Sequence, residues 1–147
     1  MTYEHVQHGY IGVATVVFML VVGIATLPET FDESAGAGWA VVAMFIVIAG
    51  ITVWFSWLKV AIKDATLSAA FGLGRPRKTI DLSDVVTATH VRNTWTQGWG
   101  IRKISGGWMY NVWGLDAIEF TMTSGDIVRI GTNDEANLLA SVRVFTG

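Results

Sequence analysis

The chain falls into two parts with different patterns of hydrophobic and polar positions. Residues 9–27 and 39–58 are apolar at most positions, and neither stretch contains a charged side chain. At a rise of ~1.5 Å per residue, a helix of this length spans about 30 Å, the thickness of the hydrocarbon core of a bilayer. A helix in water needs a polar face, and these stretches have none. We therefore expect two membrane-spanning helices over residues 9–27 and 39–58, with an N-terminal tail over residues 1–8 and an extracytoplasmic loop over residues 28–38.

After residue 58 the pattern changes to short, alternating segments separated by glycine-rich turns. The clearest example is the run in which Ile118, Phe120 and Met122 alternate with Glu119 and Thr121. Such alternation is typical of a half-buried strand. Strands are predicted over residues 65–71, 78–81, 85–91, 99–104, 108–112, 116–123 and 127–130.

The last segment of the chain has helical spacing instead. Thr132 followed three residues later by Glu135 fits a capping box, and apolar residues then recur at intervals of three and four. A helix is predicted over residues 133–145, closing the open end of the sheet. Residues 59–147 are therefore expected to form a small α+β domain of about seven antiparallel strands and a C-terminal helix.

Charge is distributed unevenly and predicts an orientation. The first 58 residues contain four acidic side chains and no Lys or Arg, whereas all ten cations lie after them. Three of those acids fall in residues 28–38. The positive-inside rule then places the C-terminal domain and the N-terminus in the cytoplasm. Aromatic side chains near the ends of the apolar stretches, such as Tyr10, Trp39 and Trp54, agree with an interfacial belt.

Two alternatives concern the apolar stretches. The first could be a cleaved signal peptide, because Ala35-Gly36-Ala37 resembles a cleavage site. It lacks a positive n-region and is longer than a usual h-region, so we expect it to remain. Small residues could serve either packing of the two helices on each other or oligomer formation, and we favour the former. These residues are Gly9, Gly12, Gly23, Ala43, Ala49 and Gly50.

Four short runs in the C-terminal part resemble a known group of proteins. They are Gly-Trp-Gly-Ile-Arg at 98–102, Trp-Met-Tyr-Asn-Val at 108–112, Gly-Leu-Asp-Ala-Ile-Glu at 114–119 and Arg-Ile-Gly-Thr at 129–132. With the spans ahead of them, they look like the bacterial membrane-anchored proteins with a pleckstrin-homology-like (PH-like) domain of unknown function. The resemblance covers about residues 65–145. It implies a PH-like fold at the bacterial cytoplasmic (inner) membrane, a role in assembly or surface contact, and no agreed reaction.

The sequence offers little for catalysis. Neither span contains an ionisable side chain, which argues against transporters, pumps and intramembrane enzymes. The chain has no cysteine, and His90 has no partner motif, while His5 and His8 lie in the predicted tail. Asp116 and Glu119 are three positions apart on a predicted strand and would point to opposite faces. We expect no enzyme activity, metal site, cofactor or small-molecule substrate.

Two groups of residues are candidates for surface contacts. Cations that follow the second span could bind anionic lipid or could only set the topology; they are Lys59, Lys63, Arg75, Arg77 and Lys78. Aromatic and basic side chains in and after a predicted loop could form an interaction surface or pack under that loop; they are Trp95, Trp99, Arg102 and Lys103. Eight acids against ten cations after residue 58 leave too little positive charge for nucleic-acid binding.

The main prediction is a non-enzymatic protein with two membrane spans whose cytoplasmic domain is a protein-interaction or assembly module. The partners expected are the phospholipid bilayer and a protein partner or a second copy of the chain. One alternative is specific binding of anionic lipid by the basic hairpin that contains Arg75, Arg77 and Lys78. Another is an accessory subunit of a larger membrane complex.

Overall fold

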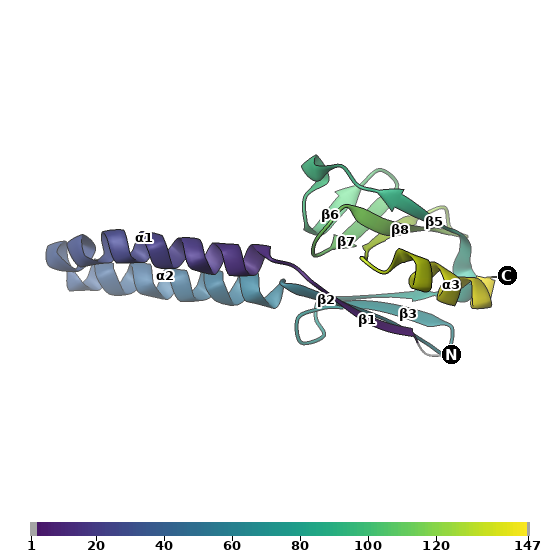
Figure 1. The fold of residues 1–147 in the computed structure, drawn as a ribbon, viewed down its shortest axis with the longest axis horizontal. Coiled ribbons are helices and arrows are strands. Elements are labelled where there is room, and N and C mark those ends of the chain that lie inside the picture. Colours follow the sequence, from purple (N-terminus) through teal and green to yellow (C-terminus); the bar gives the residue numbers. More distant parts are fainter. Residues whose placement is uncertain (1–2, 147) are drawn as a thin grey trace.

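The protein consists of a long helical hairpin attached to one end of a β domain (Figure 1). The structure is a computed structural model that describes residues 3–146. The hairpin comprises α1 (Ile11–Glu33) and α2 (Ala35–Trp54), which pack side by side along their length. Both helices are long and apolar enough to cross a membrane.

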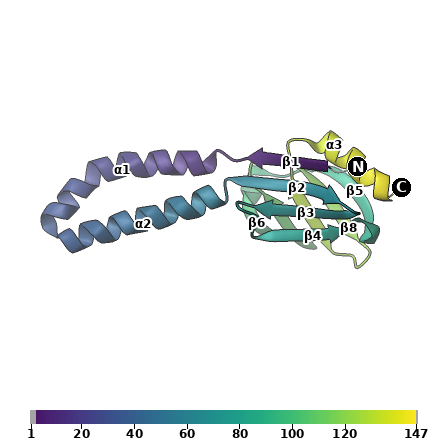
Figure 2. The same ribbon diagram turned by 90° about the horizontal axis from the view of Figure 1, so that it is seen from below.

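The borders of the hairpin differ from the predicted ones. Residues 28–38 were expected to form a loop, but only Ser34 is non-helical, and its Oγ accepts a hydrogen bond from the amide of Ala37 at 3.4 Å. Pro28 lies inside α1, which curves toward α2 near its end (Figure 2). The second apolar stretch was expected to reach residue 58. Instead α2 ends at Trp54, because Trp57 and Leu58 begin a strand whose Leu58 is fully buried in the domain.

The first sheet contains β1 (Tyr3–His8), β2 (Trp57–Lys63), β3 (Thr66–Phe71) and β4 (Arg77–Asp81), in that order and all antiparallel. Figure 2 shows these strands side by side. The segment predicted as a tail is therefore a strand, paired with β2 from Tyr3 opposite Ile62 to His8 opposite Trp57. The helical hairpin is thus the connection between two neighbouring strands of one sheet.

The second sheet has five strands in the order β5-β8-β9-β7-β6. Their bounds are β5 (Val85–Arg92), β6 (Gly100–Ile104), β7 (Gly107–Asn111), β8 (Asp116–Met122) and β9 (Ile127–Gly131). β7 and β9 are parallel, and the other neighbours are antiparallel. Residues 3–146 therefore form nine strands rather than about seven, the two unpredicted ones being β1 and β2.

Short helices complete the domain. The 3₁₀ helix η1 (Leu82–Asp84) connects the two sheets, and a second one, η2 (Trp95–Gln97), precedes β6. The C-terminal helix α3 (Glu135–Thr146) lies between the two sheets at one side (Figure 1). Its Leu138 and Val142 are fully buried in the core between the sheets, with Phe71 and Phe120 among their fellow core residues. Burial of each such aliphatic side chain contributes about 1.5–3 kcal/mol.

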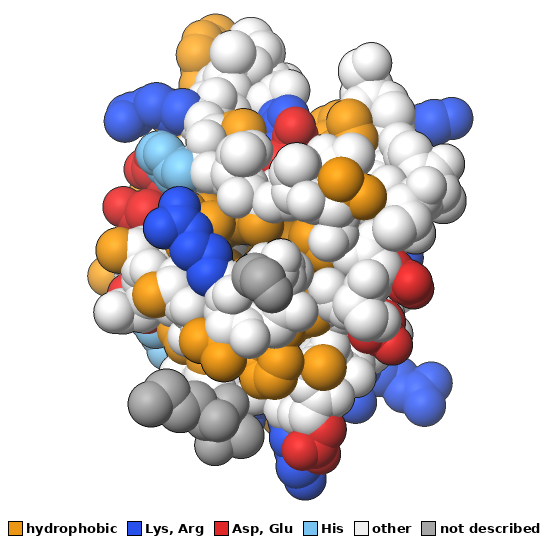
Figure 3. Space-filling view, turned by 90° about the vertical axis from the view of Figure 1, so that its right-hand side faces the viewer, with side chains coloured by type: hydrophobic (Ala, Val, Ile, Leu, Met, Phe, Trp, Pro, Cys, Tyr) orange, Lys and Arg blue, Asp and Glu red, His pale blue; other side chains and the backbone are white. Residues whose placement is uncertain are grey.

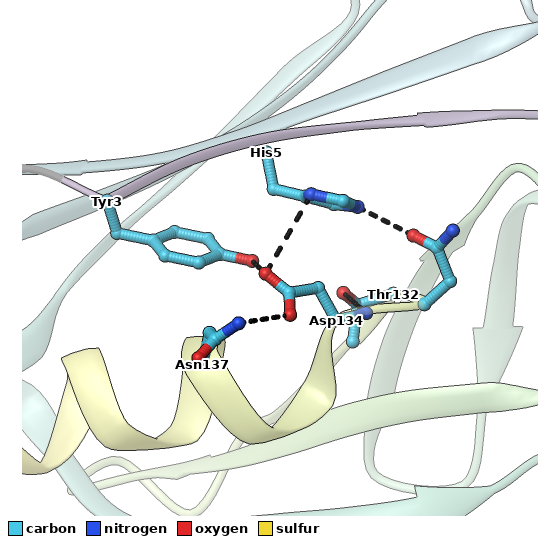
Figure 4. A network of polar contacts seen from close by, with 6 residues as sticks. Tyr3, His5, Thr132, Asp134 and Asn137 are labelled. Atoms are coloured by element: carbon cyan, nitrogen blue, oxygen red, sulfur yellow. Dashed lines mark hydrogen bonds and ion pairs between the residues drawn. The ribbon is translucent and has the colours of Figure 1, made fainter.

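A polar network fixes the edge strand β1 against the start of α3 (Figure 4). The hydroxyl of Tyr3 donates to Asp134 Oδ2 at 3.1 Å, and a His5 ring nitrogen lies 2.6 Å from Asn133 Oδ1. Thr132 Oγ1 accepts from the amide of Asp134 at 3.0 Å, but α3 begins at Glu135 and the carbonyl of Asp134 accepts its first helical hydrogen bond, so Asp134 and not the predicted Thr132 is the cap. Burial, followed by the charge of Asp134, raises the pKa of Tyr3. The network therefore ties the first strand of the chain to its last helix.

Candidate membrane-surface site

The hairpin enters the β domain through two short connections that are hydrogen-bonded to each other. The amide of Gly9 donates to the carbonyl of Ser56 at 2.6 Å, which extends the β1–β2 pairing to the first turn of α1. A Cβ at Gly9 would lie 2.7 Å from the carbonyl oxygen of Val112, so the connection also packs against the second sheet. The end of the domain at these connections, called here the hairpin-facing end, is therefore held in one orientation relative to the helices.

The β3–β4 turn, residues 72–76, lies beside the end of α2. The indole of Trp57 donates to the carbonyl of Gly72 at 2.7 Å, and the indole of Trp54 donates to the carbonyl of Arg75 at 2.6 Å. Gly72 has φ +51°, and a Cβ there would lie 2.6 Å from the carbonyl oxygen of Trp54. These contacts clamp the turn to the helix. Leu73 at its tip is 81% exposed.

Two of the predicted lipid-contacting cations belong to this turn or follow it directly. Arg75 and Arg77 are exposed, and neither forms an ion pair within residues 3–146. Lys78 comes next in β4 and is half-buried opposite Ala69. The structure therefore brings Arg75 and Arg77 close to the end of α2, together with the apolar Leu73.

The other two predicted cations lie elsewhere. Lys59 forms an ion pair with Glu4 across the β1–β2 ladder, with 2.8 Å between Nζ and Oε1. Lys63 is at the far end of β2, which at ~3.3 Å per residue lies about 20 Å from the start of that strand at Trp57. Lys63 is therefore not part of the hairpin-facing end.

A cavity of about 460 Å³ lies on the hairpin-facing end, between the helices and the loop before β6. Its walls come from the first turn of α1, the last turn of α2 and the backbone of residues 98–100. Trp99 lines it and stacks on Trp113, with 5.3 Å between ring centroids and 11° between planes. Tyr10 meets the same Trp113 edge-on at 5.7 Å. An aromatic cluster therefore supports one wall of the cavity.

Arg102 is the cation of this cavity. Its Nε donates to the carbonyl of Trp99 at 3.2 Å, so the guanidinium folds back over the loop. Gly98 has φ +68°, and a Cβ there would lie 3.3 Å from an Arg102 terminal nitrogen. Trp95 on η2 is 77% exposed, and Lys103 on β6 is exposed; neither lines the cavity. The structure thus brings together Trp99 and Arg102 among the four predicted interaction residues.

Two further polar contacts join neighbouring strands of the second sheet. His90 lies 3.0 Å from Asp116 on the surface, and Arg129 binds Glu119 on the neighbouring strand. Across residues 3–146, no group of three or more His, Cys, Asp or Glu could hold a metal ion. Figure 3 shows the end of the domain opposite the hairpin, where charges of both signs are spread around the rim.

Leu73 and Trp113 are site residues that the sequence analysis did not single out. Leu73 stands between two glycines, two residues before Arg75, a pattern that indicates an exposed turn. Trp113 follows a predicted strand, and only the fold brings it to Trp99 and Tyr10. No protein-family profile matches the chain, and no curated protein sequence is significantly similar to it.

Proposed function

We propose that this chain is a non-enzymatic protein of the bacterial cytoplasmic membrane whose β domain binds the anionic surface of the adjoining leaflet through the β3–β4 turn. The observation that carries the proposal is the clamp of Trp54 and Trp57 on that turn, which holds Leu73, Arg75 and Arg77 beside the end of α2. The turn would meet the headgroups wherever α2 leaves the hydrocarbon.

The pairing of β1 with β2 supports the proposed topology. A chain that crosses a bilayer twice returns to the side from which it started, and β1 and β2 stand on either side of the two helices. The N-terminus and the β domain then share one side. The positive-inside rule favours the cytoplasm, because all ten Lys and Arg residues follow α2.

Simple energetics support contact with an anionic leaflet. Each Arg near such a surface contributes about 1 kcal/mol, and transfer of a Leu side chain from water into the acyl boundary adds about 2 kcal/mol. The two arginines together therefore contribute about as much binding free energy as the insertion of Leu73. The contribution of the arginines to binding falls at high salt because screening shortens the range over which surface charges act.

A PH-like assignment is part of the proposal. Two sheets followed by a C-terminal helix are compatible with that architecture, and so is the position of the spans before most of the domain. The nine strands and the parallel pairing of β7 with β9 depart from it. The assignment therefore rests on the sequence resemblance more than on topology.

The absence of cysteine from the chain makes a site-specific test straightforward. We would label Leu73→Cys of the full-length protein with a polarity-sensitive fluorophore and reconstitute it in neutral or anionic nanodiscs. We expect emission shifted to the blue in anionic discs and a reversal of that shift at high salt. In the same protein, Arg75→Gln with Arg77→Gln should abolish most of the difference between the two lipid compositions.

The matched control is Lys63→Gln with Lys103→Gln, which also removes two positive charges but leaves the turn intact. It should behave like the parent labelled protein. Equal emission in neutral and anionic discs, or an unchanged shift after the two Arg substitutions, would refute lipid binding by the turn.

A second candidate function is assembly with a protein partner, as a homo-oligomer or as an accessory subunit. The observation in its favour is Trp95, which is 77% exposed on a short helix with a complete capping box. Exposed tryptophans held by local structure are typical centres of protein interfaces. If this is the function, Trp95→Ala should lose a partner that co-purifies in mild detergent, whereas Arg75→Gln with Arg77→Gln should retain it.

A further inference from the structure

The cavity at the hairpin-facing end has two kinds of wall. Ile11, Ile51 and Phe55, at the ends of the helices, make one side apolar, while the loop before β6 contributes Trp99 and β6 itself contributes Arg102. In Figure 1 this loop lies on the other side of the domain from the β3–β4 turn, so the cavity and the turn flank the base of the hairpin. A volume of about 460 Å³ is within the range of sites that hold small ligands.

Arg102 is the one charged side chain among the residues that line the cavity, and it is exposed. Its Nε donates to the carbonyl of Trp99, and it forms no ion pair among residues 3–146. Trp99 Nε1 is buried and closed off from the cavity, so Trp99 contributes its ring to the wall and no donor to a ligand. A guanidinium held in place by such a hydrogen bond is a group that binds phosphate oxygens.

We propose that this cavity binds the headgroup of one anionic phospholipid from the adjoining leaflet, with the guanidinium of Arg102 donating to the phosphate. The proposal depends on the membrane placement given above but not on lipid binding by the β3–β4 turn. The acyl chains would leave along the apolar side formed by α1 and α2.

Charge and position favour this occupant over others. The lining residues include one cation, Arg102, and no acid, so the ammonium of a zwitterionic headgroup would find no partner there. The last turn of α2 and the first turn of α1 place the cavity at the level where a spanning helix meets the headgroups. A lipid reaches that level without leaving the bilayer, whereas a soluble ligand would have to compete with it.

The test is native mass spectrometry of the full-length protein released from nanodiscs that contain equal phosphatidylglycerol and phosphatidylcholine. We expect one retained phosphatidylglycerol per chain. Arg102→Gln should lower the retained fraction about tenfold, the effect of losing one charge-assisted hydrogen bond.

Two controls separate this site from the turn. Lys103→Gln removes the neighbouring charge that does not line the cavity, and Arg75→Gln with Arg77→Gln removes the charges of the turn. Both should retain lipid as the parent protein does. The proposal is overturned if no phospholipid is retained, if phosphatidylcholine is retained equally, or if Arg102→Gln leaves retention unchanged.

Discussion

The helical hairpin and the β domain use the same apolar residue types in opposite ways. In α1, Phe18 is 67% and Ile24 is 79% exposed, whereas Leu58, Ile62 and Phe120 of the domain are fully buried. A hydrophobic side chain in the domain gains by leaving water, while one on the helices gains only if lipid surrounds it. Whether an apolar surface must be covered by protein therefore depends on whether water or lipid surrounds it.

The contacts that hold each region together differ accordingly. In α1 the buried residues are Gly12, Met19 and Gly23, two of them glycines. A Cβ at Gly12 would crowd Ser56 and lie 3.0 Å from the carbonyl oxygen of Thr52. The two helices can therefore approach this closely only because Gly12 has no side chain. The domain instead fills its core with large aliphatic and aromatic residues. The helices of the hairpin therefore pack through close backbone approach at glycines, whereas the domain packs by filling its core with large side chains.

The largest test of this comparison removes the hairpin. Residues 10–55 would be replaced by Asn-Gly, a two-residue turn suited to joining antiparallel strands, since Gly9 already donates to Ser56. We expect the protein to move from the membrane pellet to the aqueous fraction after lysis without detergent. It should still unfold cooperatively in urea, because its core lies outside the hairpin.

A matched truncation checks that result. Deleting residues 1–63 removes the hairpin but also β1 and β2, and with them the buried Leu58, Val60 and Ile62. We expect this fragment to show no cooperative transition. A hairpin-free protein that stays with the membrane, or that is unfolded, would contradict the division into two regions.

A smaller effect is expected where the helices touch. Gly12→Ala should destabilise the hairpin by about 1–3 kcal/mol because it overpacks the contact with Ser56 and Thr52. Gly50→Ala is the control, since nothing lies within 4 Å of a Cβ at that position. It should be neutral or stabilising by up to about 1 kcal/mol, the difference in helix propensity. Thermal unfolding in detergent measures both, and equal effects would argue against packing at Gly12.

The smallest effect concerns the network between β1 and α3. Tyr3→Phe should cost about 1 kcal/mol through loss of the hydrogen bond to Asp134. The pKa of Tyr3 is raised in the folded protein above its ordinary value of 10.0, so the unfolded chain loses this proton first. The stabilisation of the folded state that results from this difference in pKa is present below pH 10 and is lost as the pH rises beyond it.

Tyr3→Phe should therefore make stability fall less between pH 8 and pH 11, as measured by thermal unfolding of the full-length protein. Some decrease of stability with rising pH should remain in the variant, because burial also raises the pKa of Tyr110. An identical pH profile for parent and variant would show that Tyr3 is not linked to folding through its proton.

Local pattern was enough for some elements and not for others. The continuous apolar runs predicted both long helices, and strict alternation predicted β8 and β9. The strand β1 was missed because its residues, Tyr-Glu-His-Val-Gln-His, are mostly polar and its partner follows both helices in the chain. The start of β2 was missed because Trp57 and Leu58 prolong the apolar run of α2.

The candidate site was predictable in its residue types but not in its grouping. Cations after the second span, and aromatic and basic residues in and after a later loop, pointed to surface contacts. Only the fold shows that Lys63 lies at the far end of β2 and that Lys59 pairs with Glu4. Similarly, the cavity combines Gly9 and Arg102, which are distant in sequence. Such combinations depend on strand order, which local spacing does not encode.

The insertion of the helices between β1 and β2 also dictates the order in which the protein can be made. Residues of β1 leave the ribosome before either helix, whereas their partners in β2 are synthesised only after both. The first strand must therefore remain unpaired until both helices have been synthesised. In the proposed topology, completion of the first sheet also requires the chain to have returned to the side of the membrane on which its synthesis began.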